Sequence, residues 1–465
     1  MRGLELPRAE VAAVLASGFV LLVLVVAGYG LAVLGVAVIA PILVAILRRP
    51  QFGIMLIVAL VPFHGLLTIA DVPEPLIAWK EVLGGVVFAA TFVCPLSARA
   101  PKGRSRPSWF APLVAFAVLA AISAAVAHNE EALVGLKITF FWVLAGLAVW
   151  RCPLNPIERD RLVSILMAVG FVCAVIGLWQ QVVGPAALNA LGYEYNTTIR
   201  SAGTILRSFS TFAEPFAFAF YLMGTMLIAT PIALSEPRRL RNRLYLLAFP
   251  IFTLGLLATV VRGGILGLGV GFAYLGFRKY RLLLAALPLA IMAVVVLSVL
   301  GGSFSSSFSS GSSFADRQAG WEENFVELTR HPFGVQIGST GAAAATAAGD
   351  APVPGIYNPD NYYFKTVYEL GVLGLWILAV FLASAFGATR RTASRAAPRD
   401  VPLLDGITAL VLGAAAASLV ANFFDAFPTN VDFAILLGVA ACLGARTPTD
   451  DDDDDLEHEA AALVA

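Results

Sequence analysis

Charged side chains are scarce in this sequence of 465 residues. Only 13% of the residues are Asp, Glu, Lys or Arg and 59% are hydrophobic, whereas a soluble domain carries about 25% charged residues. Hydrocarbon tolerates almost no unpaired charge, so this composition excludes an ordinary soluble protein and predicts a polytopic integral membrane protein. The formal net charge is 0, which gives no reason to expect a nucleic-acid partner.

Cysteine and histidine are also rare, with four residues of each. Cys94, Cys152, Cys173 and Cys442 form no C-x-x-C pattern, so we expect neither a disulfide nor a metal site. No phosphate-binding P-loop or G-x-G-x-x-G motif lies on a hydrophilic segment, which argues against ATP-driven chemistry. We therefore expect no cofactor.

Long apolar runs are what the sequence has instead. Runs of about 17–25 residues mark membrane-spanning helices, and fourteen candidates can be counted. They are residues 11–28, 31–47, 53–70, 76–94, 110–127, 132–150, 162–183, 209–230, 244–261, 263–277, 282–300, 363–386, 403–421 and 431–445. The predicted fold class is all-α: a polytopic membrane protein whose large extracytoplasmic loop contains short interfacial helices.

Basic residues occur in alternate loops between these runs. They lie at 48–49, 99–106, 151–161, 238–243, 278–281 and 390–399. The positive-inside rule places these loops, and with them both termini, in the cytoplasm. The predicted organisation is helices 1–11 in residues 1–300, an outer loop at 301–362, helices 12–14 in 363–445 and a disordered acidic cytoplasmic tail at 446–465.

The outer loop is the only long polar interval of the chain. Apolar residues at helical spacing, Trp321 among them, predict a helix over 314–330 that lies flat on the outer leaflet or packs against neighbouring helices. The low-complexity segment that follows is typical either of a substrate lid or of a disordered insertion.

Arginine on the predicted outer side requires an explanation. The outer arginines are Arg200, Arg207, Arg262, Arg317 and Arg330. Arg262 interrupts two apolar runs, and an arginine at membrane depth costs ~3 kcal/mol or more, so it either faces a cavity or partner or snorkels to the interface. Several such arginines at one place would bind phosphate or diphosphate, which guanidinium groups grip with two hydrogen bonds.

Other polar residues near the outer ends of helices leave several interpretations open. Glu214, near the start of the 209–230 run, can pair with an outer arginine or act on a sugar hydroxyl. His331, in an H-P-F-G turn, is a candidate base or a turn residue. The remaining candidates are interfacial residues, paired residues or substrate contacts: Lys80, Glu81, Lys137, Asp425 and Asp432.

Five segments carry a resemblance over residues 200–445. In order, they are RSFSTFAEP, VRGGILGLGVG, the R-x3-W of Arg317 and Trp321, HPFGVQIGS and DNYYFKTVYELGVLG. In this order and spacing they resemble the O-antigen ligase/polymerase superfamily of bacterial cell-envelope glycosyltransferases. The resemblance implies a GT-C-type, metal-independent enzyme that takes a glycan from a polyprenyl-diphosphate carrier on the outer face of the plasma membrane. It also implies that Arg207, Arg262 and Arg317 hold the diphosphate.

One position departs from the ligase pattern, which has His, then Asn, Ser or Gln, then nine residues, then G-x-x-G. Asn361, Gly371 and Gly374 fit this pattern, but Asp360 stands at the histidine position. A carboxylate with an ordinary pKa near 4 is a weaker base than imidazole. We therefore expect a polysaccharide polymerase, with ligase-type transfer to a lipid or polymer as the alternative.

The expected chemistry is attack of an acceptor hydroxyl on the anomeric carbon, with Asp360, Glu214 or His331 as base or orienting group. The residues assigned to the acceptor or to a lid are Asn361, Trp321 and Tyr362. Expected partners are the polyprenyl-diphosphate-linked oligosaccharide, a glycan or lipid acceptor, the bilayer and a chain-length regulator. The rival hypothesis is a transporter of an anionic or lipid-linked solute, for which charges near mid-membrane on broken helices would be expected.

Overall fold

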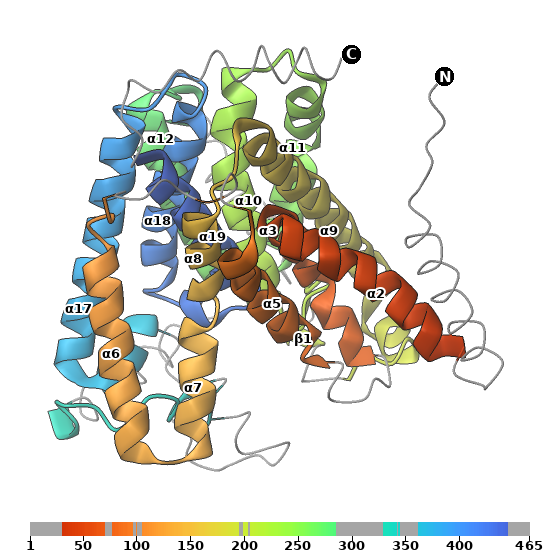
Figure 1. The fold of residues 1–465 in the computed structure, drawn as a ribbon. Helices are drawn as coiled ribbons and strands as arrows, with labels where there is room; N and C mark the ends of the chain where they lie inside the picture. Colours follow the sequence, from red (N-terminus) through yellow and green to blue (C-terminus); the bar gives the residue numbers. More distant parts are fainter. Residues whose placement is uncertain are drawn as a thin grey trace, which may run out of the picture.

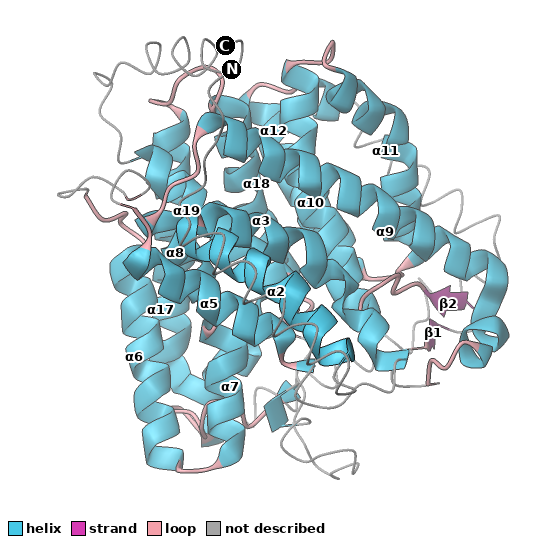
Figure 2. Ribbon diagram, turned by 45° about the vertical axis from the view of Figure 1, so that its right-hand side comes forward, coloured by secondary structure: helices cyan, strands magenta, loops and turns pink. Residues whose placement is uncertain are grey.

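A computed structural model of the chain describes residues 30–69, 77–95, 99, 105–194, 199–202, 205–284, 329–341, 343–344 and 361–444. Over these ranges the chain is almost entirely helical, and two short strands are the exception (Figures 1 and 2). Three predicted site residues, Arg317, Trp321 and Asp360, lie outside the described residues. So do the run at 11–28, residues 285–300 of the run at 282–300, and the acidic tail.

The first part of the described chain is a series of helices with clear start signals. The elements are α2 (Gly30–Arg48), α3 (Pro50–Leu60), the 3-10 segment η2 (Val61–Ile69), α5 (Trp79–Val93), α6 (Phe110–Ala127), α7 (Glu130–Phe140), α8 (Val143–Arg151) and α9 (Pro156–Ala190). Asn129 caps α7 by accepting a hydrogen bond from the Ala132 amide at 3.0 Å. Asn155 and Glu158 form a reciprocal capping box at the start of α9, a pattern that satisfies otherwise unpaired amides.

The second part contains the strands and the most enclosed helices. The elements are β1 (Arg200–Ala202), β2 (Ile205–Arg207), α10 (Pro215–Ser235), α11 (Leu240–Ala258), α12 (Arg262–Arg278), α17 (Tyr362–Ala393), α18 (Val401–Ala417), η4 (Phe423–Asp425) and α19 (Thr429–Gly444). Two long helices are broken at a glycine with positive φ: α9 at Gly184 (φ 74°) and α17 at Gly371 (φ 71°).

Helix α10 lies at the centre of the molecule and is buried along nearly its whole length (Figure 1). It packs against α9, α11, α12 and α18. A helix that is apolar on every side is typical of such a surrounded position. Glycines bring α12 and α18 close together, since a Cβ on Gly267 would lie 2.7 Å from the Gly413 carbonyl oxygen.

The outward face of α6 shows what surrounds the molecule. Val114, Val118, Ile122 and Val126 are 43–77% exposed, and their spacing of four places them on one side of the helix. A continuous exposed apolar stripe is unfavourable in water but is the ordinary surface of a helix that faces lipid.

Six of the described helices are long and apolar enough to cross a membrane, and the pair α7–α8, bent by 41°, would make a seventh. The prediction of a helical, polytopic membrane protein is therefore confirmed. Every predicted run within the described residues contains a helix, although 132–150 is divided at Phe141 and Trp142 between α7 and α8. The count of fourteen spans stays a prediction.

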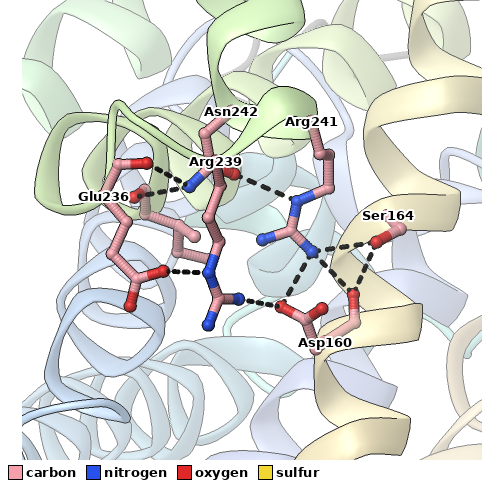
Figure 3. Close-up of polar contacts among 7 residues, drawn as sticks. Asp160, Ser164, Glu236, Arg239, Arg241 and Asn242 are labelled. Carbon is pink, nitrogen blue, oxygen red and sulfur yellow. Dashed lines mark hydrogen bonds and ion pairs between the residues drawn. The ribbon is translucent and has the colours of Figure 1, made fainter.

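Three of the basic stretches meet at one end of the helix bundle. Arg241, in the first turn of α11, and Arg239, at its N-cap, donate to the Asp160 carboxylate of α9 at 2.8 and 3.3 Å (Figure 3). Arg159 donates to both carboxylate oxygens of Asp400, before α18, at 2.9 and 3.1 Å. Three loops predicted to lie on the same side of the membrane are thus in contact.

Two predicted outer loops meet at the other end. The α6–α7 turn and segment 329–341, coloured teal, lie together at the bottom of Figure 1. The Asn129 amide donates to the side-chain oxygen of Gln336 at 3.0 Å, and the Gln336 amide donates to Glu131 at 3.1 Å. The three basic stretches named above and these two outer loops therefore lie at opposite ends of the bundle, and the full topology stays a prediction.

Candidate active site

A short hairpin places two of the predicted arginines side by side. Strands β1 and β2 are antiparallel, with Arg200 opposite Arg207, and directly opposed residues project from the same face. Arg200 Nη2 lies 4.0 Å from Glu214 Oε2, and the Arg207 guanidinium lies 4.8 Å from the centre of the Phe216 ring. Two arginines and one acid thus gather at the end of α10 that is remote from the basic loops.

The turn after the hairpin is held by two glutamines of α9. Gln180 accepts from the Ser210 amide at 2.7 Å and donates to the Ser210 carbonyl at 2.8 Å. Gln181 donates to the Ser208 hydroxyl at 2.8 Å. Ser210 has a φ of 55°, and these buried hydrogen bonds offset the strain of that conformation. The R-S-F-S-T motif is therefore a rigid support for Arg207.

Glu214 lies before α10 and not one turn inside it. The sequence predicted a run from 209, but the helix begins at Pro215 and Glu214 takes the N-cap position with extended backbone. The physical reason is that a residue before proline is disfavoured in helical geometry. Burial raises the pKa of the Glu214 carboxyl, Arg200 and Arg207 lower it, and Asp425 raises it. Solvent still reaches 38% of the side chain, which moderates the shift.

Arg262 is the first residue of α12, directly after a tight turn. Val260 in that turn has a φ of 53°. Arg207 Nε donates to the Thr259 carbonyl oxygen at 3.2 Å, and the Ser208 amide donates to the Ala258 carbonyl at 2.9 Å. The segment that carries Arg207 is therefore bonded to the turn that leads to Arg262.

The two glycines after Arg262 serve helix packing. A Cβ on Gly263 would lie 3.3 Å from the Ala421 Cβ, and one on Gly264 would lie 3.1 Å from the Ala219 Cβ. Helix α12 packs closely against α10 and α18. Both glycines are therefore occupied by close packing of α12 against neighbouring segments of the protein.

A buried charged group lies beside this arrangement. Lys365 forms an ion pair with Asp425, and its Nζ lies 3.7 Å from Glu369 Oε1. Thr340 donates to Glu369 Oε1 at 2.7 Å. The three charged side chains are at most 7% exposed. The Asp425 carboxylate raises the pKa of the Glu214 carboxyl, and we refer to this buried group and the arginine hairpin together as the polar region.

The H-P-F-G turn and the G-x-x-G glycines form one structural unit. The Val372 amide, freed by the break in α17, donates to the Pro332 carbonyl at 3.1 Å. A Cβ on Gly371 would lie 2.6 Å from the Phe333 carbonyl carbon, and one on Gly334 would lie 2.6 Å from the Gly371 nitrogen. Only glycine allows the turn to enter the break this closely.

Three further predicted residues have local structural contacts. His331 is half-buried, with its ring centre 6.0 Å from that of Tyr368. Asn361 caps α17 by accepting hydrogen bonds from the amides of Tyr363 and the next residue at 2.9 and 3.2 Å. Tyr362 is only 3% exposed. Their roles as base, acceptor contact or lid stay predictions.

Sequence reasoning overlooked His64, because it lies inside an apolar run. The Trp79 indole Nε1 lies 3.2 Å from His64 Nδ1, and Lys80 Nζ lies 2.6 Å from His64 Nε2. Lys80 and His64 both lie beside Phe427. The centre of the Phe427 ring is 4.4 Å from Lys80 Nζ and 5.5 Å from the His64 ring centre. The signal in the sequence was a lone histidine in a span followed by Trp-Lys at the start of the next.

Backbone contact joins this histidine to the rest of the site. A Cβ on Gly65 would lie 2.2 Å from the carbonyl carbon of Phe212 and 2.4 Å from the amide nitrogen of Ala213. Glu214 is the next residue along the chain. His64 therefore stands beside the segment that carries Glu214.

An apolar cavity of about 90 Å³ lies between α6, α7, α8, α17 and α19. Its lining includes Trp109, Trp142, Phe381, Tyr362 and Phe424. Phe424 precedes Asp425, so the cavity adjoins the polar region. Within the part of the chain that the structure describes, no group of three or more His, Cys, Asp or Glu residues is arranged to hold a metal ion.

Fold and site together define a polytopic membrane protein with an arginine-rich polar region at one end of its helices. Residues 247–379 match the family model described as O-antigen ligase. A 246-residue stretch is 22% identical to an O-antigen polymerase of Salmonella muenchen, covering 49% of this chain and 60% of the relative's length. Both matches confirm the resemblance to the O-antigen ligase/polymerase superfamily.

Proposed function

We propose that the protein transfers a glycan from a polyprenyl-diphosphate carrier to an acceptor hydroxyl, and that it polymerises repeat units of a cell-surface polysaccharide. The observation that carries this proposal is the pairing of Arg200 with Arg207 beside Glu214, with Arg207 hydrogen-bonded to the turn before Arg262. Several guanidinium groups held by rigid backbone suit a diphosphate better than any neutral ligand.

The arginines would act mainly on the leaving group. As the bond between the anomeric carbon and the diphosphate oxygen breaks, negative charge develops on that oxygen. Arg207 and Arg262, with Arg317 as predicted from the sequence, would stabilise this charge without reorganisation. Three cations supply the charge compensation that a metal would otherwise provide, so we propose transfer without a metal.

Glu214 would orient the attacking hydroxyl. Its carboxylate lies at the N-cap of α10, 4.0 Å from Arg200, so it can accept a hydrogen bond from a sugar hydroxyl beside the diphosphate. Asp360 and His331 remain the other predicted candidates for this role. Asn361, Trp321 and Tyr362 would contribute to acceptor binding or to closure of the loop.

The aromatic cavity beside Phe424 suits a lipid-bearing substrate. It is lined almost entirely by apolar side chains, and it runs among helices that we propose cross the membrane. An isoprenoid segment of the carrier can enter it while the diphosphate stays with the arginines.

Polymerase activity is favoured over ligase activity by one residue. Asp360 stands where the ligase pattern has histidine. Ligase-type transfer of the glycan to a lipid or polymer is the second candidate, because the matched family model is described as O-antigen ligase.

The proposed setting is the plasma membrane, with fourteen spans, both termini cytoplasmic and the arginines on the outer side. The basic loops that meet at the opposite end of the bundle support this orientation under the positive-inside rule. A chain-length regulator is the proposed protein partner.

The test is a reconstituted transfer reaction. Purified protein in lipid vesicles is mixed with a defined carrier-linked repeat unit, without ATP or nucleotide sugar and with a chelator, and products are separated by size. A ladder of carrier-linked products supports the polymerase, and a single addition to an added lipid acceptor supports the ligase. Movement of solute across the vesicle without any new glycosidic bond would refute both and favour the transporter.

A further inference from the structure

We propose that Lys80, positioned by His64, is the proton acceptor of the reaction, and that it performs this role as a neutral amine. The proposal rests on the glycosyl transfer proposed above. It also rests on the hydrogen bonds of the His64 ring. The Trp79 indole nitrogen lies 3.2 Å from His64 Nδ1, and Lys80 Nζ lies 2.6 Å from His64 Nε2.

The number of hydrogens that these groups can share determines the protonation state. The indole N–H of Trp79 can only donate, so His64 Nδ1 must be the acceptor in that contact. A neutral imidazole then carries its hydrogen on Nε2 and donates it. Lys80 Nζ must therefore accept, and an ammonium group has no lone pair with which to do so. The only assignment that satisfies both contacts leaves Lys80 as a free amine.

The surroundings of Lys80 are consistent with a neutral amine. Among the described residues, no carboxylate lies within ion-pair distance of Lys80 Nζ, and neighbouring Glu81 is paired with Lys137 of α7 at 3.7 Å. A lysine that lacks such a partner in a half-buried site loses its proton readily. The charged groups that act on Lys80 are Glu81 and Lys137.

Phe427 adds a function for the protonated state. Its ring centre lies 4.4 Å from Lys80 Nζ, and the face of an aromatic ring attracts an ammonium ion. Once Lys80 has taken a proton, the ring stabilises the new charge. Lys80, between His64 and the Phe427 ring, is thus suited both to accept a proton and to hold it briefly.

The position of the pair suits the reaction. Gly65, next to His64, contacts the backbone just before Glu214, and Phe427 lies two residues after Asp425. In the step, the hydroxyl O–H bond breaks and its proton moves to Lys80 Nζ. The oxygen bonds to the anomeric carbon, and the bond from that carbon to the diphosphate oxygen breaks. That electron pair leaves on the diphosphate, and Lys80 later releases the proton to water.

The test substitutions separate a lone pair from a positive charge. Lys80→Arg keeps a cation that cannot lose its proton, so transfer should fall on the order of 100-fold, the usual contribution of a general base. Lys137→Arg, on the neighbouring helix, is the matched control and should keep wild-type activity. Equal activity of Lys80→Arg and wild type in the vesicle reaction would overturn the proposal.

Amine rescue distinguishes chemistry from structure. Lys80→Ala should lose transfer and regain it with added methylamine, in proportion to the free-amine fraction as pH rises. Tetramethylammonium and guanidinium, which carry charge but no available lone pair, should not restore it. Rescue by these cations, or no rescue in a Lys80→Ala protein that remains monodisperse, would refute the role. A wild-type protein without transfer would instead reject the proposed function itself.

Discussion

Arg207 and the turn before Arg262 are joined by a hydrogen bond between residues 52 positions apart. This bond ties Arg207 to the segment that leads into α12, at the end of α10 where Arg200 and Glu214 also lie. The neighbouring lysines differ from them in their partners. Lys365 is enclosed by two acids, whereas Lys80 has a histidine and an aromatic ring. The two lysines therefore differ in the charge and type of the groups that surround them.

Substitution of Arg262 tests the diphosphate site. Arg262→Ala removes a cation that would stabilise the departing diphosphate, so transfer should fall by about 100-fold or more while the protein still reaches the membrane. The measurement is the reconstituted transfer reaction. Arg243→Ala, an exposed arginine at the basic end of the bundle, is the control and should behave as wild type. Full activity of Arg262→Ala would remove this residue from the site.

The Lys365–Asp425 pair is expected to behave as a coupled unit. Lys365→Met leaves Asp425 and Glu369 buried without their cation, which should cost about 3–5 kcal/mol of stability. The double variant Lys365→Met, Asp425→Asn should lose less than the sum of the two single variants, since the Asp425 charge is then no longer buried without its cation. Thermal unfolding of the four proteins in detergent measures the coupling. Additive losses would show that the pair does not interact.

Two long helices, α17 and α9, are each interrupted at a glycine. Helix α17 is interrupted at Gly371, and the H-P-F-G turn fills the interruption. The break separates the first part of α17, which carries Lys365 and Glu369, from the rest of the helix. This first part contacts η4 through the Lys365–Asp425 ion pair. In α9 the break at Gly184 precedes Pro185, and a Cβ added to Gly184 would meet no neighbouring atom of the described residues within 4 Å.

These two glycines form a matched pair for an element-scale prediction. Both have positive φ, 71° at Gly371 and 74° at Gly184, so alanine should cost about 1–3 kcal/mol of backbone strain at either position. Gly371→Ala should cost more, because its Cβ would also meet the Phe333 carbonyl carbon at 2.6 Å. Thermal unfolding should rank wild type above Gly184→Ala, and Gly184→Ala above Gly371→Ala. The reverse order would contradict the close fit of the turn.

The whole molecule is a bundle with two chemically different ends. At one end, Arg239 and Arg241 pair with Asp160 (Figure 3), and Arg159 pairs with Asp400. At the other end lie the arginine hairpin, η4 and segment 329–341 (Figure 1). Between them, exposed apolar stripes such as that of α6 face outward. This division is what a membrane around the apolar zone requires.

Membrane orientation can be measured with single cysteines. The four native cysteines are buried, so they give little background. Glu130→Cys, at the exposed start of α7, should react with a membrane-impermeant maleimide in intact spheroplasts, because the positive-inside rule places it outside. Arg238→Cys, in the basic α10–α11 turn, should react only after permeabilisation. Labelling of both residues from the same side would refute the topology.

Much of this protein could be predicted from the sequence by itself. The scarcity of charged residues indicated a membrane protein, and the apolar runs predicted where helices lie. The basic residues in alternate loops divided the loops into two predicted groups. These features are local, since each depends on the transfer of a segment between water and lipid. The outer arginines could be recognised for the same reason: an arginine near membrane depth needs a partner wherever it lies in the fold.

Only the tertiary structure decided which residues meet. It joined Arg207 to the turn before Arg262, enclosed Lys365 between two acids and brought His64 beside the segment of Glu214. It also showed that Gly263 and Gly264 pack against neighbouring helices and that Gly371 packs against the H-P-F-G turn. In an apolar sequence, periodicity shows that a helix exists but does not show which neighbour it faces. That choice depends on close packing and on hydrogen-bond partners far apart in the chain, which no local pattern encodes.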